Sequence, residues 1–201
     1  MTTRLDREAL LDAFDRIGFA AIAAGTKLHI VVYGGSALML ASNFRFATED
    51  VDIADIGGDW PKWLTEVVAT IAVEKGWSDD WLNDGVVFHL SALADRAKDH
   101  LEFGTFPRDS SPPGLVVSVP TAEYLLALKL KAFRTQDTLR GDTERLDILN
   151  LMDVVGISTA DQAIAVLGKY FPISAASSEK QRFLLKNIDK SGKSDAPKYP
   201  R

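Results

Sequence analysis

The spacing of apolar residues divides the chain into two stretches of different character. Up to about residue 119, short β-branched runs alternate with amphipathic segments, whereas beyond Pro120 apolar residues recur at helical spacing. This change predicts an α/β domain over 1–119, a helical C-terminal domain over 120–190 and a flexible tail over 191–201. We therefore expect an α/β (α+β) fold, in which a small mixed sheet with flanking helices precedes a helical bundle.

The ends of the expected elements coincide with glycine, proline or capping residues. Helices are expected over 5–24, from Ser36 to 44, and over 61–76, 121–134, 142–155, 160–171 and 178–190. Strands are expected over 28–33, 49–57, 86–93 and 115–119, and residues 100–106 form either a further strand or a partly ordered segment. The segment 76–85 is expected to be a loop, whose Trp77, Trp81 and Asn83 either pack over the sheet edge or face an acceptor.

Composition and charge exclude several classes of protein. The 201 residues are 46% hydrophobic and 25% charged, which is typical of a globular protein. A net charge of −5 argues against a broad surface that coats nucleic acid, and the lack of cysteine excludes disulfides and thiol chemistry. No apolar run reaches the roughly 18 residues that span a bilayer. We expect a cytoplasmic protein with no membrane partner.

Gly34, Gly35 and Ser36 follow a predicted strand and open a predicted helix. Free backbone N–H groups at a helix start favour an anion, and glycine lets a phosphate approach the backbone closely. The Ser36 hydroxyl either caps the helix or touches that phosphate. A plain turn with a helix cap explains the same three residues, so this motif alone leaves both interpretations open.

Asp50 and Asp52 lie one residue apart in the next predicted strand. Side chains alternate along a strand, so both carboxylates are expected on one face. Two close carboxylates repel each other unless a cation lies between them, and Mg²⁺ accepts carboxylate oxygens together with substrate phosphates. A solvated strand face is the alternative interpretation of the pair.

Taken together, the segments "YGGSALML" and "RFATEDVDI" resemble the nucleotidyltransferase superfamily, and more closely its AbiEii-like branch, which includes toxins of toxin–antitoxin pairs. The segments "DDWLND", "LLALKLKAFR" and "ERLDILNL" match the same branch, so the resemblance covers roughly residues 30–155. It implies a nucleotidyltransferase-like sheet in which Gly34, Gly35 and Ser36 bind the nucleotide and Asp50 and Asp52 bind Mg²⁺.

Four further residues belong to the expected site. Arg45 either reaches a phosphate or pairs with Asp50, and Thr48 fixes the start of the strand. The superfamily's third carboxylate, on a later strand, is missing from 86–93 and 115–119. The resemblance offers Lys129 and Asp147 instead, with Lys129 on a phosphate and Asp147 either orienting the lysine or activating the acceptor. A purely structural ion pair between the two helices is the alternative.

The implied reaction moves a nucleoside monophosphate from an NTP to a hydroxyl group and releases pyrophosphate. The acceptor is expected to be tRNA, another RNA or a protein, with a small alcohol such as an aminoglycoside as an open alternative. A cognate antitoxin is a further expected partner. The missing strand carboxylate leaves a second hypothesis open, a degenerate member of the superfamily that binds a nucleotide or a protein without catalysis.

Overall fold

The computed structural model describes residues 5–54, 58–133, 138–188 and 190–200, with only the backbone for 138–141. Within these residues one five-stranded sheet has the order β5-β4-β2-β7-β6, and β1 and β3 form a separate pair. The strands are β1 (Leu5–Asp6), β2 (Leu28–Val32), β3 (Ala47–Thr48), β4 (Val51–Ala54), β5 (Leu82–Asn83), β6 (His100–Phe106) and β7 (Leu115–Pro120).

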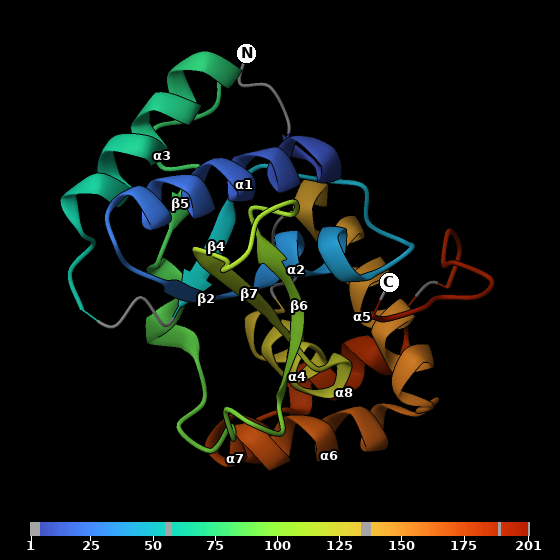
Figure 1. Cartoon of the computed structure of the whole chain (residues 1–201). Coiled ribbons are helices and arrows are strands. Elements are labelled where there is room, and N and C mark those ends of the chain that lie inside the picture. The colour runs from blue at the N-terminus through green and yellow to red at the C-terminus, as the bar shows by residue number, and fades with distance from the viewer. Residues whose placement is uncertain (1–4, 55–57, 134–137, 189, 201) are drawn as a thin grey trace.

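Helices surround the sheet and make up most of the second half of the chain (Figure 1). They are α1 (Arg7–Ala23), α2 (Gly34–Ala41), α3 (Lys62–Lys75), the 3₁₀ helix η1 (Gly85–His89), α4 (Ala122–Ala132), α5 (Thr138–Val155), α6 (Ala160–Tyr170), α7 (Pro172–Ala176) and α8 (Glu179–Lys186). A mixed sheet with flanking helices confirms the predicted fold class.

The sheet is mixed because its central strand β2 has neighbours of opposite direction. β2 runs parallel to β7 and antiparallel to β4, while β6 is antiparallel to β7 and β5 is parallel to β4. Nearly every residue of β2 and β7 is buried, as expected for central strands covered on both faces.

The two faces of the sheet carry different helices. In Figure 1, α1 and α3 lie together at the top, α4, α6, α7 and α8 gather below the sheet, and α5 lies to its right. Phe14 of α1 packs edge-on against Phe106 of β6, with ring centroids 5.4 Å apart. On the other side Tyr124 of α4 packs at 6.5 Å against Tyr33 and at 4.8 Å against Tyr170 of α6. The aromatic contacts thus attach both helical layers to the sheet.

Two glycines bring α1 onto the backbone of the sheet. A Cβ on Gly18 would lie 2.6 Å from the carbonyl carbon of Phe106, and one on Gly114 would lie 2.1 Å from the carbonyl oxygen of Gly18. Real Cβ atoms do not approach backbone so closely. The close packing of α1 against β6 and β7 therefore requires glycine at both positions.

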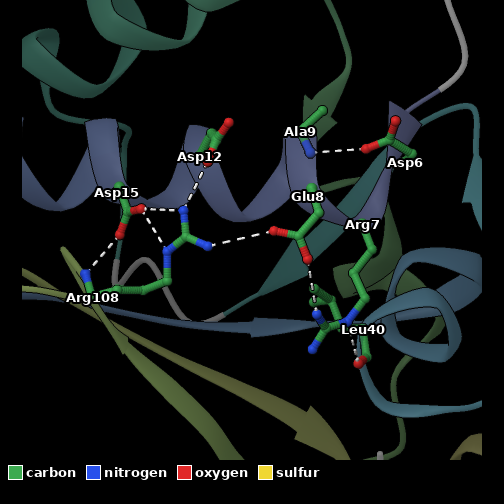
Figure 2. A network of polar contacts seen from close by, with 8 residues as sticks. All are labelled: Asp6, Arg7, Glu8, Ala9, Asp12, Asp15, Leu40 and Arg108. Carbon is green, nitrogen blue, oxygen red and sulfur yellow. Dashed lines mark hydrogen bonds and ion pairs between the residues drawn. The ribbon is translucent and has the colours of Figure 1, made fainter.

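An arginine from the turn after β6 holds the same helix from the side (Figure 2). Arg108 bonds Asp12 and Asp15 through its side chain at 2.7 Å, and its backbone N–H also donates to Asp15 at 2.7 Å. Glu8 lies one turn away at 3.7 Å from the same guanidinium. These charges are partly exposed, so the network fixes the position of α1 more than it stabilises the fold.

The strand expected over 86–93 is wrong, because Gly85–His89 forms a 3₁₀ helix. The side chain of Asn83 accepts a hydrogen bond from the N–H of Gly85 at 3.0 Å and turns the chain away from the sheet. Val87 and Phe88 are exposed, so the apolar run that suggested a buried strand is not buried. The place beside β4 belongs to β5, within the segment expected to be a loop.

The other predicted elements occur close to their expected positions. Residues 100–106 form strand β6, Thr121 caps α4, and Thr159 caps α6 with a capping box that includes Gln162. Residues 55–57, the expected end of the second strand, and Arg134, the expected end of the helix before α5, lie outside the described residues.

One finding bears on the membrane. Within the described part of the chain no single helix is long and apolar enough to cross a bilayer. Asp142–Val155 and Ala160–Tyr170 satisfy the length and composition together, but the chain bends by 88° between them.

The close packing of α1 gives the first testable prediction. We expect Gly18→Ala to lower the free energy of unfolding by about 1–3 kcal/mol, the usual cost of overpacking, because its Cβ meets backbone that has no side chain to move. Gly168→Ala in α6 is the matched control, since its Cβ would lie 3.4 Å from the Cβ of Ala175. The control should be neutral or stabilising, as alanine is the better helix former. Equal stabilities of both variants in urea denaturation would contradict the close approach.

Candidate nucleotide and metal site

The candidate site begins where β2 leads into α2. The helix starts at Gly34, which has a φ of 64°, rather than at Ser36 as predicted. Ser36 is buried and its hydroxyl donates to the carbonyl of Tyr33 at 2.8 Å. No side chain caps α2, so the N–H groups of its first turn keep the capacity to bind an anion.

Gly34 leaves space for a carboxylate from the neighbouring strand. A Cβ at this position would lie 2.8 Å from Oδ2 of Asp52, and the positive φ adds a second reason for glycine. Asp52 lies in β4 and is partly buried, whereas Asp50 is exposed and precedes the strand by one residue. Thr48 donates its hydroxyl to the backbone carbonyl of Asp50 at 3.1 Å and so fixes the turn into the strand.

The electrostatic surroundings of Asp52 disfavour its charge. Burial raises the pKa of the Asp52 carboxyl above its ordinary value, and the neighbouring charge of Asp50 raises it further. The charge of Lys129, a hydrogen bond from Asn83 and the charge of His89 act in the opposite direction. The cost of ionising Asp52 beside Asp50 is therefore only partly offset by these groups. An added cation would favour the ionised form of both carboxylates.

Arg45 does not pair with Asp50, the aspartate predicted as one of its two possible partners. Its Nη1 donates to Oδ2 of Asp147 at 3.2 Å and its Nε to the carbonyl of Ala47 at 3.0 Å, so the expected pair with Asp50 is not formed. A Cβ on Gly35 would lie 3.1 Å from Nη2 of Arg45 and 3.1 Å from Oγ1 of Thr48. Gly35 thus leaves room for the guanidinium beside the start of α2.

Lys129 and Asp147 form the interhelical ion pair that the sequence suggested. The Nζ of Lys129 in α4 donates at 2.9 Å to the same Oδ2 of Asp147 that Arg45 contacts. The side chains of Asp147 and Lys129 are 3% and 14% exposed. The charge of Lys129 also acts on Asp52, where it lowers the pKa of the carboxyl.

The structure brings the predicted residues into one region from four parts of the chain. Gly34, Gly35 and Ser36 come from α2, Arg45 and Thr48 from the turn around β3, Asp50 and Asp52 from β4 and the residue before it, and Lys129 and Asp147 from the helix pair α4 and α5. The contacts described above connect each of them to another member except Ser36, whose hydroxyl is used within α2.

Sequence reasoning missed how Asn83 and His89 join this region. Asn83 is the register partner of Asp52 through the parallel pairing of β4 with the two-residue strand β5. So short a strand carries no detectable periodicity, although its position beside two buried tryptophans was a usable signal. The rings of Trp77 and Trp81 pack on each other with centroids 4.9 Å apart, and Nε1 of Trp81 donates to the carbonyl of Val68 at 3.1 Å. Of the two roles predicted for these tryptophans, the structure thus shows packing.

A third carboxylate does not complete the pair. Glu102 on β6 is exposed, and strands β2 and β7 separate it from β4, a distance of about 14 Å at the usual spacing of strands. Within the described residues no group of three or more His, Asp or Glu side chains is arranged to hold a metal ion. Any metal here would depend on two carboxylates together with oxygens from a ligand.

The contact between Gly34 and Asp52 can be separated from the effect of backbone conformation. Gly25→Ala and Gly34→Ala share a positive φ, 67° and 64°, but nothing lies within 4 Å of a Cβ on Gly25. We expect Gly25→Ala to lose about 1–2 kcal/mol of unfolding free energy, the cost of a left-handed alanine. Gly34→Ala should lose more, since its Cβ also displaces Asp52. Equal losses in chemical denaturation would show that Asp52 does not approach the helix start.

Comparisons of this chain with protein-family models, with curated proteins and with solved structures found no match.

Proposed function

We propose that this chain is a Mg²⁺-dependent nucleotidyltransferase of the AbiEii-like kind, which moves a nucleoside monophosphate from an NTP to an acceptor hydroxyl. One observation carries the proposal: the carboxylate of Asp52 lies against the uncapped start of α2, where a Cβ on Gly34 would be 2.8 Å away. An anion-binding helix start and a metal-binding carboxylate are needed side by side to hold the phosphates of an NTP together with their metal ion.

The residues present fit a magnesium ion. Asp50 and Asp52 provide hard oxygen ligands. A divalent cation would reduce both their mutual repulsion and the cost of keeping Asp52 charged while it is partly buried. Mg²⁺ is usually bound by one or two carboxylates plus substrate phosphates, so the pair suffices without a third protein ligand. When bound, Mg²⁺ would neutralise charge on the triphosphate and on the departing pyrophosphate.

Each polar group of the site has a defined role in this proposal. The N–H groups at Gly34 and Gly35 bind the terminal phosphates, and Lys129 stabilises the charge that develops on the transferred phosphoryl group. Asp147 holds both Lys129 and Arg45 and thereby orients them. In the reaction the acceptor oxygen forms a bond to the α-phosphorus, the bond from that phosphorus to the pyrophosphate oxygen breaks, and the hydroxyl proton leaves to solvent.

The acceptor is proposed to be tRNA, another RNA or a protein, in a cytoplasmic setting where a cognate antitoxin would oppose a toxic transfer. Incubation with NTPs labelled at the α-phosphate, Mg²⁺ and total cell RNA or protein tests this proposal. Label in RNA or protein that depends on Asp52 supports it, and label in neither contradicts it.

A second function is favoured by the lack of a third carboxylate near Asp52. In that case the chain binds a nucleotide or a protein partner without catalysis. A thermal shift with NTP and Mg²⁺ but no labelled product would select this nucleotide-binding function. No shift with any NTP would leave only protein binding.

Asp52→Asn tests the metal pair directly. We expect the affinity for NTP in the presence of Mg²⁺ to fall by about tenfold or more, since a ligand is lost. Stability should not fall and should rise slightly, because the raised pKa of Asp52 means that folding disfavours its charge and asparagine carries none. Asp79→Asn on the exposed loop is the control. Calorimetric titration with Mg²⁺ and NTP decides; unchanged affinity in Asp52→Asn would refute the pair as a metal site.

Lys129→Met separates catalysis from structure. Asp147 keeps Arg45 as a partner in this variant, so the fold should survive. We expect the transfer rate to fall roughly a hundredfold or more, as for loss of a group that stabilises the transition state. Lys169→Met is the control, since it removes a lysine–carboxylate pair of similar length, 3.0 Å to Glu123, at an exposed position elsewhere in the helical half. Single-turnover rates equal to wild type in a folded Lys129→Met variant would return the lysine to a structural role.

A further inference from the structure

The last segment of the chain, expected to be a flexible tail, lies along α5. Lys193 forms an ion pair with Asp153, and the N–H of Ser194 donates to Oδ1 of Asn150 at 3.0 Å. Asn150 is buried, so its side chain offers a fixed acceptor to the passing backbone. Two successive turns of α5 therefore hold this segment on the helical half of the molecule.

Beyond Ser194 the same segment crosses to the α/β half. Asn43, in the loop after α2, donates from Nδ2 to the carbonyl of Ala196 at 3.0 Å and accepts from the N–H of Lys198 at 2.8 Å. The two bonds use both ends of one amide, which is a specific match to an extended backbone. Asn43 thus acts as the anchor of the segment on the α/β half.

Tyr199 fastens the end of the segment where the two halves meet. Its hydroxyl donates at 2.5 Å to the carbonyl of Pro120, the last residue of β7 and the start of the link to α4. The ring is partly buried against the core, and burial raises the pKa of Tyr199. An aromatic ring with a bonded hydroxyl is a strong anchor for an otherwise irregular segment.

These contacts join the same two parts of the chain that the candidate site joins. Asn43 lies two residues before Arg45, and Asn150 lies one helical turn after Asp147. We infer that residues 193–199 form a strap that keeps the Arg45 loop against α5, and that Asn43 and Tyr199 are positioning residues of the candidate site. The inference deepens the proposed function and rests on it wherever activity is the readout.

The physical reason lies in the geometry of the ion pair. Arg45 and Asp147 come from different halves, and their pair is 3.2 Å long with the aspartate buried. A buried carboxylate depends on its cations staying close, since separation exposes an unpaired charge to a low-dielectric interior. A strap that fixes both backbones reduces the freedom of the two side chains and so favours the short contact.

Asn43→Ala tests the strap without touching the proposed chemistry. Hydrogen exchange should become faster, by about tenfold, in residues 44–48 and in the strap backbone, because opening of the strap becomes cheaper by about one hydrogen bond or more. Asn187→Ala is the matched control, as Asn187 follows α8 directly and its amide donates at 2.8 Å to the carbonyl of Phe183 in that helix. Equal exchange in residues 44–48 for the two variants would overturn the inference.

A thermodynamic cycle gives a second readout that does not depend on activity. Tyr199→Ala and Arg45→Met alter separate parts of the chain that share no bonded partner. Independent sites lose stability additively, whereas a strap that supports the ion pair makes the double loss smaller than the sum of the single losses. Strict additivity in urea denaturation would contradict the strap. Because Arg45→Met leaves Asp147 paired with Lys129, both variants should fold.

Kinetics then connect the strap to the site. If the wild-type chain transfers nucleotide, Asn43→Ala should lower kcat about tenfold or more, because the groups that it positions would shift. Lys198→Ala is the control and should leave kcat unchanged. Its side chain is exposed, and its hydrogen bond to Asn43 comes from the backbone. An unchanged kcat in Asn43→Ala would refute the positioning role. A wild type without transfer would refute the proposed function alone, since the exchange and stability readouts still judge the strap.

Discussion

The carboxylate of Asp147 is the point on which the junction of the two halves depends. One oxygen, Oδ2, accepts hydrogen bonds from Lys129 at 2.9 Å and from Arg45 at 3.2 Å, one donor from the helical half and one from the α/β half. A carboxylate that is buried this far from water depends on cations that bond it, and here two of them share one oxygen. Charge therefore joins apolar packing in fixing α5 beside α4 and the Arg45 loop.

Gly34 and Gly35 have a structural role besides the proposed contact with phosphates. Gly34 faces the carboxylate of Asp52 and Gly35 faces the guanidinium of Arg45, so each missing side chain leaves room for a charged group of the site. The start of α2 therefore has a negative charge beside Gly34 and a positive charge beside Gly35. The charge of Lys129 lowers the pKa of Asp52, the negative member of the two. Such a layout would suit the nucleotide and metal ion that we propose as ligands, because each component would meet a group of opposite sign.

The sequence predicted the parts of this account that rest on local chemistry. Short β-branched runs that end at glycine or proline located β2, β4 and β7, and the residue types located the carboxylates and the lysine. The contact of Arg45 with Asp147 was not predictable, since it joins residues 102 apart through a tertiary fold. The error at 86–93 has a local cause: the apolar run Val86–Phe88 follows Asn83, whose side chain holds the N–H of Gly85 and starts a 3₁₀ turn. Likewise the end of the chain has the composition of a loose tail, and tertiary contacts such as those with Asn43, Asn150 and Pro120 give it a fixed course.

The central claim, that Asp50, Asp52 and the start of α2 together hold a metal ion and the phosphates of a nucleotide, can be seen directly. A crystal structure of the chain with Mn²⁺ in place of Mg²⁺ and an NTP analogue that cannot be cleaved between its α- and β-phosphates would reveal the metal by its anomalous scattering. The account predicts one anomalous peak between the carboxylates of Asp50 and Asp52, with triphosphate oxygens completing its coordination and the N–H groups of Gly34 and Gly35 on the phosphates. A nucleotide bound elsewhere, or no manganese between these carboxylates at saturating concentrations, would contradict it.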